Sequence, residues 1–176
     1  MKITSPGLKC SEMTHILNNF KAKELEIEAS LNQKFTYDKP FGSYTKLVLT
    51  CTSWMSFANI RDLMGKCEWL ELKNLKTIEM LNLLLIDWMT SENRTLKYLK
   101  FQLADDYDID YSEMDRVLSG IETSPMVIRP EWEKFLENKD DIDWYEGSDI
   151  RRADGVEATV VIDQDDDQKI CMMIYL

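Results

Sequence analysis

The chain has 176 residues, the usual size of one domain, and 44% of them are hydrophobic, with only six Gly and four Pro, which is typical of a globular protein. Its 32 acidic residues against 21 basic ones give a net charge of −11, which disfavours binding to nucleic acid and to anionic membrane surfaces. The only histidine, His15, leaves histidine-based triads and His-rich metal sites without their usual residues.

The four cysteines indicate the compartment. They have no CxxC spacing and are too sparse for the framework of a small secreted protein. The N-terminal residues show no signal-peptide pattern, and apolar runs such as residues 83–86 are too short to cross a bilayer. We therefore expect an intracellular protein, cytoplasmic or nuclear, with reduced thiols.

A six-residue pattern, apolar-x-x-Leu-x-apolar, recurs along the chain. Four copies lie at residues 22–27, 44–49, 67–72 and 96–101, and a weaker fifth copy, with Met126 in place of leucine, lies at 123–128. The key positions are 22, 23, 29 and 27 residues apart, within the range of leucine-rich repeats, about 20–29 residues. The pattern predicts five parallel strands.

Helical periodicity alternates with these strands. Apolar residues recur at helical spacing over residues 13–20, 57–64, 78–88 and 114–121. The residues placed to cap the helix starts are Ser11, Ser56, Thr77 and Asp110, and those placed to end helices are Gly65 and Gly120. Right-handed strand–helix–strand crossovers put all helices on one face of a parallel sheet. The sequence thus predicts an α/β fold, a short irregular solenoid similar to leucine-rich repeats.

The turns that follow the strands depart from the standard repeat. Where Asn or Cys is usual, this chain has Ser30, Thr52, Leu75 and Ala104. The hydroxyls of Ser30 and Thr52 are able to bond neighbouring backbone, whereas Leu75 and Ala104 have no such group. We therefore expect irregular repeats.

The last part of the chain breaks the repeat. A short helix signal at residues 132–136 is followed by strand patterns at 156–162 and 168–176, with a turn at Asp154-Gly155 and an acidic turn at 163–167. Residues 1–103 carry a net charge of +3 and residues 104–176 one of −14. We expect a single domain, 1–176, with βα repeats over about 11–130 and a C-terminal helix and antiparallel hairpin or meander over about 131–176.

Motifs that carry enzyme chemistry are absent from the sequence. It has no GxGxxG, no phosphate-binding GxxxxGK followed by Ser or Thr, and no HExxH. The carboxylates at 105–110 lack the glycine and glutamate of a calcium loop, so we interpret them, like 140–143 and 163–167, as solvated acidic loops. A Cys10–His15 nucleophilic pair lacks a third, orienting group. We expect no enzyme activity, cofactor or metal.

The strand residues that alternate with the leucines face away from the helices, and repeat proteins use this face for binding. The candidate partner-binding residues are Lys46, Val48, Trp69, Lys73, Tyr98, Lys100 and Gln102. Two aromatic rings rimmed by lysines are typical of a protein-binding hot spot, and the lysines suit an acidic partner segment. The alternative is that the rings pack against the chain's own C-terminal segment.

Three stretches carry a family resemblance. They are residues 88–100, beginning Trp-Met-Thr-Ser and continuing Asn-Arg-Thr-Leu-Lys-Tyr-Leu-Lys, the helix at 112–120, and Asp-Ile-Arg-Arg-Ala-Asp-Gly at 149–155 leading to Ala-Thr-Val at 158–160. With these stretches the chain resembles the nematode F-box-associated domain of the Caenorhabditis type. The resemblance covers most of the chain, and its motifs are structural rather than catalytic.

The resemblance implies a substrate-recruiting role in an SCF-type ubiquitin ligase, with ligase components as partners if an F-box is supplied elsewhere. An F-box needs about 40–50 residues, and only about 11 precede the first expected helix, so we expect none in this chain. The alternative is a scaffold or inhibitory protein that is independent of ubiquitin and uses the same face, because a fold alone does not fix a function. The target protein stays open.

Overall fold

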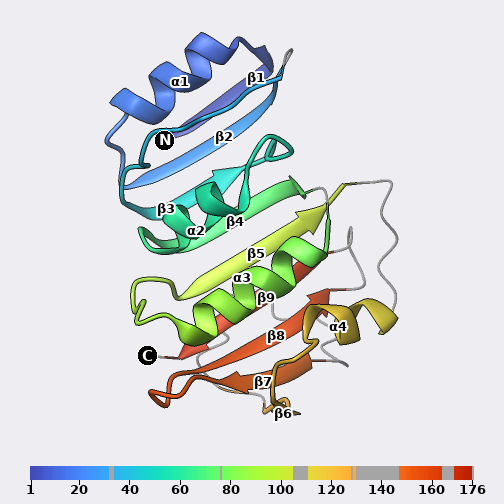
Figure 1. Ribbon diagram of the computed structural model, residues 1–176. Helices are drawn as coiled ribbons and strands as arrows, with labels where there is room; N and C mark the ends of the chain where they lie inside the picture. Colours follow the sequence, from blue (N-terminus) through green and yellow to red (C-terminus); the bar gives the residue numbers. More distant parts are fainter. Residues whose placement is uncertain are drawn as a thin grey trace.

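The computed structural model describes residues 1–31, 34–75, 77–104, 111–127, 129, 147–163 and 169–175 (Figure 1). The elements in chain order are β1 (Lys2–Leu8), α1 (Cys10–Asn19), β2 (Glu24–Leu31), β3 (Tyr44–Leu49), α2 (Phe57–Met64), β4 (Cys67–Leu75), α3 (Glu79–Thr90), β5 (Tyr98–Leu103), α4 (Tyr111–Val117), β6 (Thr123–Pro125), β7 (Gly147–Arg151), β8 (Glu157–Asp163) and β9 (Lys169–Tyr175). The short helix expected at 132–136 lies outside the described residues.

One mixed sheet of nine strands runs through the molecule in the order β1-β2-β3-β4-β5-β9-β8-β7-β6. β1 to β5 are parallel, and β9 to β6 continue the sheet as an antiparallel meander. The α/β class, the parallel part and the C-terminal meander are therefore confirmed. Because β9 pairs with β5, the C-terminal strands extend the sheet directly (Figure 1).

The repeated leucines share one register. Leu25, Leu47, Leu70 and Leu99 lie directly opposite one another on four adjacent strands, and each is at most 1% exposed. Together with the next row, Ile27, Leu49, Leu72 and Phe101, they pack into the main core with the buried residues of the helices. Four copies of the sequence pattern thus mark four strands, and which of their faces is buried.

The fifth copy of the pattern was interpreted wrongly. Only residues 123–125 form a strand, β6, and it pairs antiparallel with β7 at the far edge of the sheet. Pro125 has no N–H for a ladder, which suits an edge strand. The place beside β5 is taken by β9, whose apolar residues Ile170 and Met172 continue the buried rows.

Two other features differ from the expected alternation. β1 was not predicted, because its alternation of polar and apolar residues is interrupted by Pro6 and Gly7, and it lies parallel beside β2. Residues 34–43, between β2 and β3, contain no helix. Phe35, Tyr37 and Phe41 of this connection are buried and take part in the core in place of helical side chains.

The helix caps were predicted in part. Ser56 accepts a hydrogen bond from the Asn59 N–H as the cap of α2, and Gly65 ends that helix. Gly120, which has φ of +76°, follows α4. The caps of α1 and α3 are Lys9 and Ile78 rather than Ser11 and Thr77. Asp110 lies outside the described residues.

Hydroxyl groups close the turns after the strands, as expected. Ser30 Oγ donates to the Pro6 carbonyl at 2.5 Å, and Thr52 Oγ1 donates to the Lys73 carbonyl at 2.5 Å. At the next turn the Ala104 N–H donates to the Leu75 carbonyl at 3.1 Å. Backbone groups therefore form the hydrogen bond where the side chain has no polar atom.

Candidate functional site

The sheet face opposite the helices, called here the open face, brings the candidate residues together. Strand register puts Lys46, Trp69 and Tyr98 side by side on β3, β4 and β5. The next row contains Val48 and Lys100, with Glu71 between them. Lys73 and Gln102 come from the same strands, two residues further along. The predicted residues therefore form one patch.

Trp69 is the centre of an ordered ladder of side chains in this patch. Its ring centroid lies 4.0 Å from that of Tyr98, and the two ring planes are tilted by 31°. On the other side, Lys46 Nζ lies 4.6 Å from the indole centroid. The indole N–H donates to Glu71 Oε1 at 2.5 Å, and Lys46 Nζ lies 3.4 Å from the same oxygen. The indole is thus held in one orientation.

The patch is less exposed than the alternation of residues predicts. Tyr98 is 5% exposed and Val48 6%, while Trp69 is half-buried. Tyr98 belongs to a small second cluster with Val161, Cys171 and Met173. The expectation of an exposed Tyr98 was therefore wrong, and for this ring the alternative of packing against the C-terminal strands is correct, because β9 lies beside β5.

Charges on the open face are paired unevenly. Lys2 Nζ lies 3.2 Å from Glu26 and 2.7 Å from Glu28, and these hydrogen bonds raise the pKa of Lys2 and lower that of Glu28. Lys46 is paired with Glu71. Within the described residues, by contrast, no ion pair involves Lys73 or Lys100, both of which are half-buried. An excess of positive charge thus lies beside Trp69.

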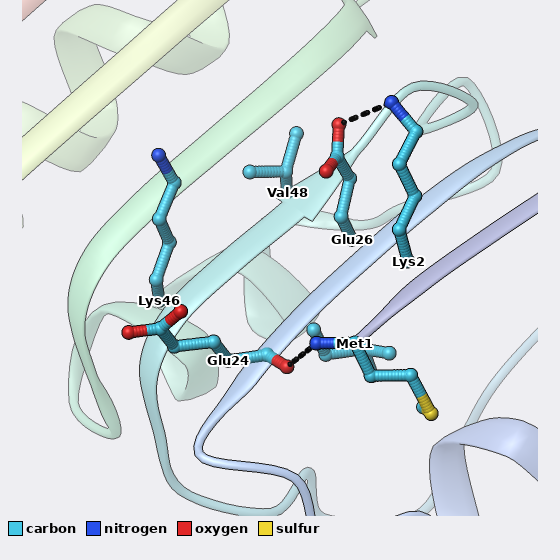
Figure 2. Close-up of a pocket in the computed structure, with 7 residues that line it drawn as sticks. Met1, Lys2, Glu24, Glu26, Lys46 and Val48 are labelled. Carbon is cyan, nitrogen blue, oxygen red and sulfur yellow. Dashed lines mark hydrogen bonds and ion pairs between the residues drawn. The ribbon is translucent and has the colours of Figure 1, made fainter.

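A shallow pocket of about 230 Å³ lies on the same face toward the edge strand β1. Figure 2 shows Lys2, Glu26, Lys46 and Val48 around it, with the Met1 amino group donating to the Glu24 carbonyl oxygen at 2.8 Å. Its lining contains two lysines and two glutamates, so it offers no single charge for a ligand to match.

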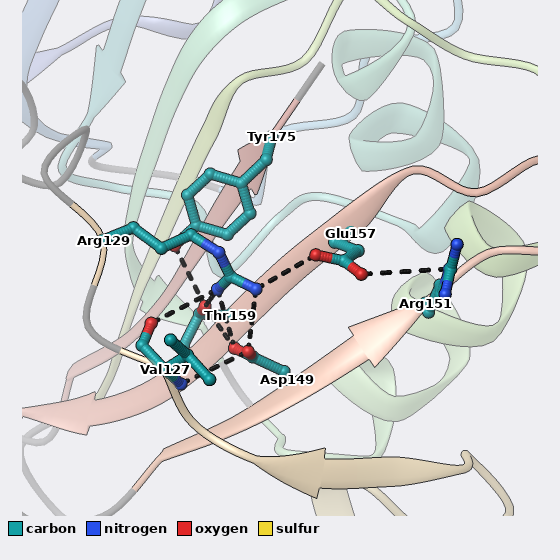
Figure 3. A network of polar contacts seen from close by, with 7 residues as sticks. All are labelled: Val127, Arg129, Asp149, Arg151, Glu157, Thr159 and Tyr175. Atoms are coloured by element: carbon teal, nitrogen blue, oxygen red, sulfur yellow. Dashed lines mark hydrogen bonds and ion pairs between the residues drawn. The ribbon is translucent and has the colours of Figure 1, made fainter.

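At the opposite end of the open face, Arg129 lies within a polar network (Figure 3). Its guanidinium donates to both oxygens of Asp149, at 3.1 and 2.9 Å, and to Glu157 Oε2 at 3.0 Å. It also contacts Thr159 Oγ1 at 3.1 Å and lies 4.3 Å from the Tyr175 ring centroid. The pairing with Asp149 raises the pKa of Arg129. This network fastens Val127 and Arg129 across the meander.

Sequence reasoning did not find this role of Arg129. Its partners come from β7, β8 and β9, between 20 and 46 positions further along the chain, so no local pattern reveals them. Asp149 and Thr159, which belong to the third resembling stretch, are 6% and 0% exposed. A buried carboxylate such as that of Asp149 needs a cation, and this requirement is what points to a partner such as Arg129.

A second network joins two of the stretches that carry the family resemblance. Arg152, 3% exposed, donates through Nη1 to the Asn93 carbonyl at 2.6 Å and through Nε and Nη2 to Asp154, at 3.1 and 2.5 Å. Its guanidinium carbon lies 5.1 Å from the Trp88 ring centroid. The hydrogen bond from Arg152 lowers the pKa of Asp154 to about 2. These residues hold the β7–β8 turn against the segment that follows α3.

The residues considered for catalysis or metal binding do not assemble in the described part of the chain. His15 contacts Asn19, and the Cys10 thiol contacts the Lys34 carbonyl. Burial raises the pKa of the Cys67 thiol to about 12, so this cysteine stays protonated at neutral pH. No three metal-ligating side chains gather among the described residues. The acidic stretches 105–110, 140–143 and 164–167 lie outside them.

Of the helices described, none combines the length and apolar character that a bilayer crossing requires. In comparisons with known proteins, no family model, no curated protein and no solved structure matches the chain.

Proposed function

We propose that this chain is a non-enzymatic protein-binding module, and that its contact surface is the open face between β3 and β5. The observation that carries the proposal is the ladder formed by Lys46, Trp69 and Tyr98. An indole fixed by Glu71 loses little rotamer freedom when a partner covers it, so more of the contact energy remains for binding. Tyr98 is buried and packs against the Trp69 ring, so it does not meet the partner directly.

The partner segment is acidic in this proposal. Lys100 lies on β5 opposite Glu71, and Lys73 lies four residues after Trp69 on β4. Neither lysine takes part in an ion pair among the described residues, and half-buried cations attract and orient carboxylates of a partner. Tryptophan surrounded by complementary charge is the composition that dominates many protein interfaces.

The cellular role that we propose is substrate recruitment for an SCF-type ubiquitin ligase within an intracellular compartment, as the resemblance to nematode F-box-associated domains suggests. Support comes from the contacts of Arg152 with Asn93 and Trp88, because these contacts hold two of the three resembling stretches, 149–155 and 88–100, together in the fold. We further propose that the four in-register leucine copies form a short array similar to leucine-rich repeats.

The test is affinity purification of the tagged chain from its native cells, followed by mass spectrometry. We compare the wild type, a face variant with Lys73→Glu and Lys100→Glu, and a control variant with Lys9→Glu and Lys34→Glu, which changes the same charge at exposed residues near α1. We expect the wild type and the control to retain the same partners and the face variant to lose them about tenfold or more.

The partner list separates the two cellular roles. Recruitment to a ligase is supported if SCF adaptor and cullin peptides are recovered with both the wild type and the face variant, while other proteins, the targets, are lost from the face variant. Reproducible face-dependent partners without ligase subunits favour a scaffold or inhibitory protein that is independent of ubiquitin. If every recovered partner binds the face variant as well as the wild type, the proposed surface is contradicted.

A further inference from the structure

A second cavity, of about 450 Å³, opens at the end of the sheet where α1 finishes and β2 and β3 begin (Figure 1). Its walls are the last turn of α1, the turn into β2, and the connection that leads into β3. Cavities that bind small molecules usually measure about 300–1,000 Å³. This cavity shares no residue with the proposed protein-binding patch, so the inference below does not depend on that proposal.

Four of the twelve residues that line the cavity are aromatic. Tyr37, Phe41 and Tyr44 are at most 7% exposed, and Phe20 at the mouth is 38% exposed. Tyr37 and Phe41 stack with ring centroids 4.8 Å apart, and the Tyr37 hydroxyl already donates to Asn18 Oδ1 at 3.0 Å. The wall therefore suits an apolar group, particularly a ring.

The Tyr44 hydroxyl is a buried polar group that lacks a hydrogen-bond partner in the described part of the chain. Burial raises the pKa of this phenol, which keeps it protonated and able to donate. Gly42 lies over it without a side chain, and an atom at its Cβ position would stand 3.5 Å from the hydroxyl oxygen, in ordinary contact. The hydroxyl itself has no accessible surface, so Tyr44 contributes its ring to the cavity and no polar contact.

Two lysines give the cavity a positive mouth. Lys21 and Lys23 line it, both are exposed, and neither takes part in an ion pair within the described residues. The nearby Lys66 is different, because it is held by Asp62 at 2.8 Å and by the Phe41 carbonyl at 3.0 Å. The charge of Lys21 and Lys23 thus remains available for an anion.

We propose that this cavity binds a small aromatic carboxylate, with the ring against Phe20 and Phe41 and the carboxylate near Lys21 and Lys23. The apolar wall supplies most of the burial, and the lysines select an acid over a neutral analogue. No covalent step is involved.

The probes are 4-hydroxyphenylacetate, phenylacetate and phenylacetamide, with binding followed by chemical-shift perturbation on the full chain. We expect both acids to bind, and the neutral amide to bind at least about tenfold more weakly. Replacing Lys21 and Lys23 by Met removes the charge but keeps the apolar stem, and should abolish the preference for acids. Lys39→Met, an exposed lysine of the same connection outside the lining, is the matched control and should leave binding unchanged.

Tyr44→Phe is a second control. Removing an unpaired buried hydroxyl should leave Tm of the free protein unchanged or raise it, because no hydrogen bond is lost. Because that hydroxyl has no accessible surface, the same change should leave the affinity for both acids unchanged. Equal binding of phenylacetamide and the acids, or no binding of any probe at millimolar concentration, overturns the proposal.

Discussion

At the scale of single residues, Arg152 is tightly constrained, because it is buried and its guanidinium is held by the Asn93 carbonyl, the Asp154 carboxylate and the Trp88 ring. Its fork geometry serves the Asn93 carbonyl and both oxygens of Asp154 at once. A lysine offers one ammonium group and does not reproduce these three contacts. The Arg-Ala-Asp-Gly sequence is therefore a structural signature, with Gly155 at φ of +88° completing the turn.

We predict a pH-dependent loss of stability in Asp154→Asn. The pKa of Asp154 is lowered from 3.8 to about 2 in the folded state, so the carboxylate stabilises the fold above about pH 4, and this contribution is lost as the pH falls toward 2. The variant should have a lower Tm than the wild type at pH 7. The difference should shrink between pH 4 and pH 2, as measured by thermal unfolding across that range.

The control for this prediction is Asp115→Asn, an exposed residue of α4 that takes part in no ion pair among the described residues. Its Tm should differ little from that of the wild type at each pH. A constant difference between Asp154→Asn and the wild type from pH 7 to pH 2 would show that the Arg152 pairing does not depend on the ionised carboxylate.

The sequence predicted the positions of some of these residues and not of others. It placed Trp69 and Lys46 in one patch because alternation along a strand assigns each residue to a face. It left the burial of Tyr98 open between two alternatives, since that burial depends on β9 lying beside β5, more than 70 positions further along the chain. It missed the buried, unpaired hydroxyl of Tyr44, which no residue pattern encodes.

At the scale of elements, the meander depends on a close approach between β7, β8 and residue 126. A Cβ at Gly147 would stand 2.6 Å from Met126 Sδ and from Val161 Cγ1, and 3.0 Å from the Val160 carbonyl oxygen. Glycine at this position lets Met126 pack over the sheet, next to the Arg129 network.

We predict that Gly147→Ala destabilises the protein by about 1–3 kcal/mol, because the added methyl group overpacks this contact. Gly65→Ala is the control, since a Cβ there meets its nearest atom at 3.5 Å and the backbone is in the ordinary right-handed region. Chemical denaturation of both variants measures the difference. Equal stability of Gly147→Ala and Gly65→Ala would mean that the 126 segment is free to move away from β7.

The sequence predicted elements well where hydrophobic periodicity was strong. Four copies of one pattern marked β2 to β5, because each strand must bury one face against the helices. The pattern failed at residues 123–128, where Met126 lies on the open face rather than in the main core. No helix was predicted at 34–43, and there three aromatic residues without helical spacing fill the place of a helix.

At the scale of the whole molecule, the parallel strands and the meander share one core. Phe101 on β5 lies opposite Ile170 on β9, and both belong to the same buried cluster as residues from β1, the helices and β8. Neither part therefore has a complete core of its own, and the chain should behave as one folding unit.

We predict a single cooperative unfolding transition. Far-ultraviolet circular dichroism and tryptophan fluorescence should give the same midpoint, and the calorimetric and van 't Hoff enthalpies should agree. Phe101→Ala should lower this shared midpoint, with a loss of about 3–5 kcal/mol, because a buried ring at the junction is removed. Two separate transitions would show that the meander folds apart from the parallel strands.

Zero-length cross-linking tests directly whether the open face binds an acidic partner. A carbodiimide joins lysine ammonium groups to carboxylates only when they are in contact, so complexes purified with the chain report which of its lysines meet an acidic partner. The account predicts that cross-links to partner carboxylates concentrate at Lys73 and Lys100, beside Trp69. Cross-links confined to lysines elsewhere in the chain, with Lys73 and Lys100 unmodified in the complex, would contradict it.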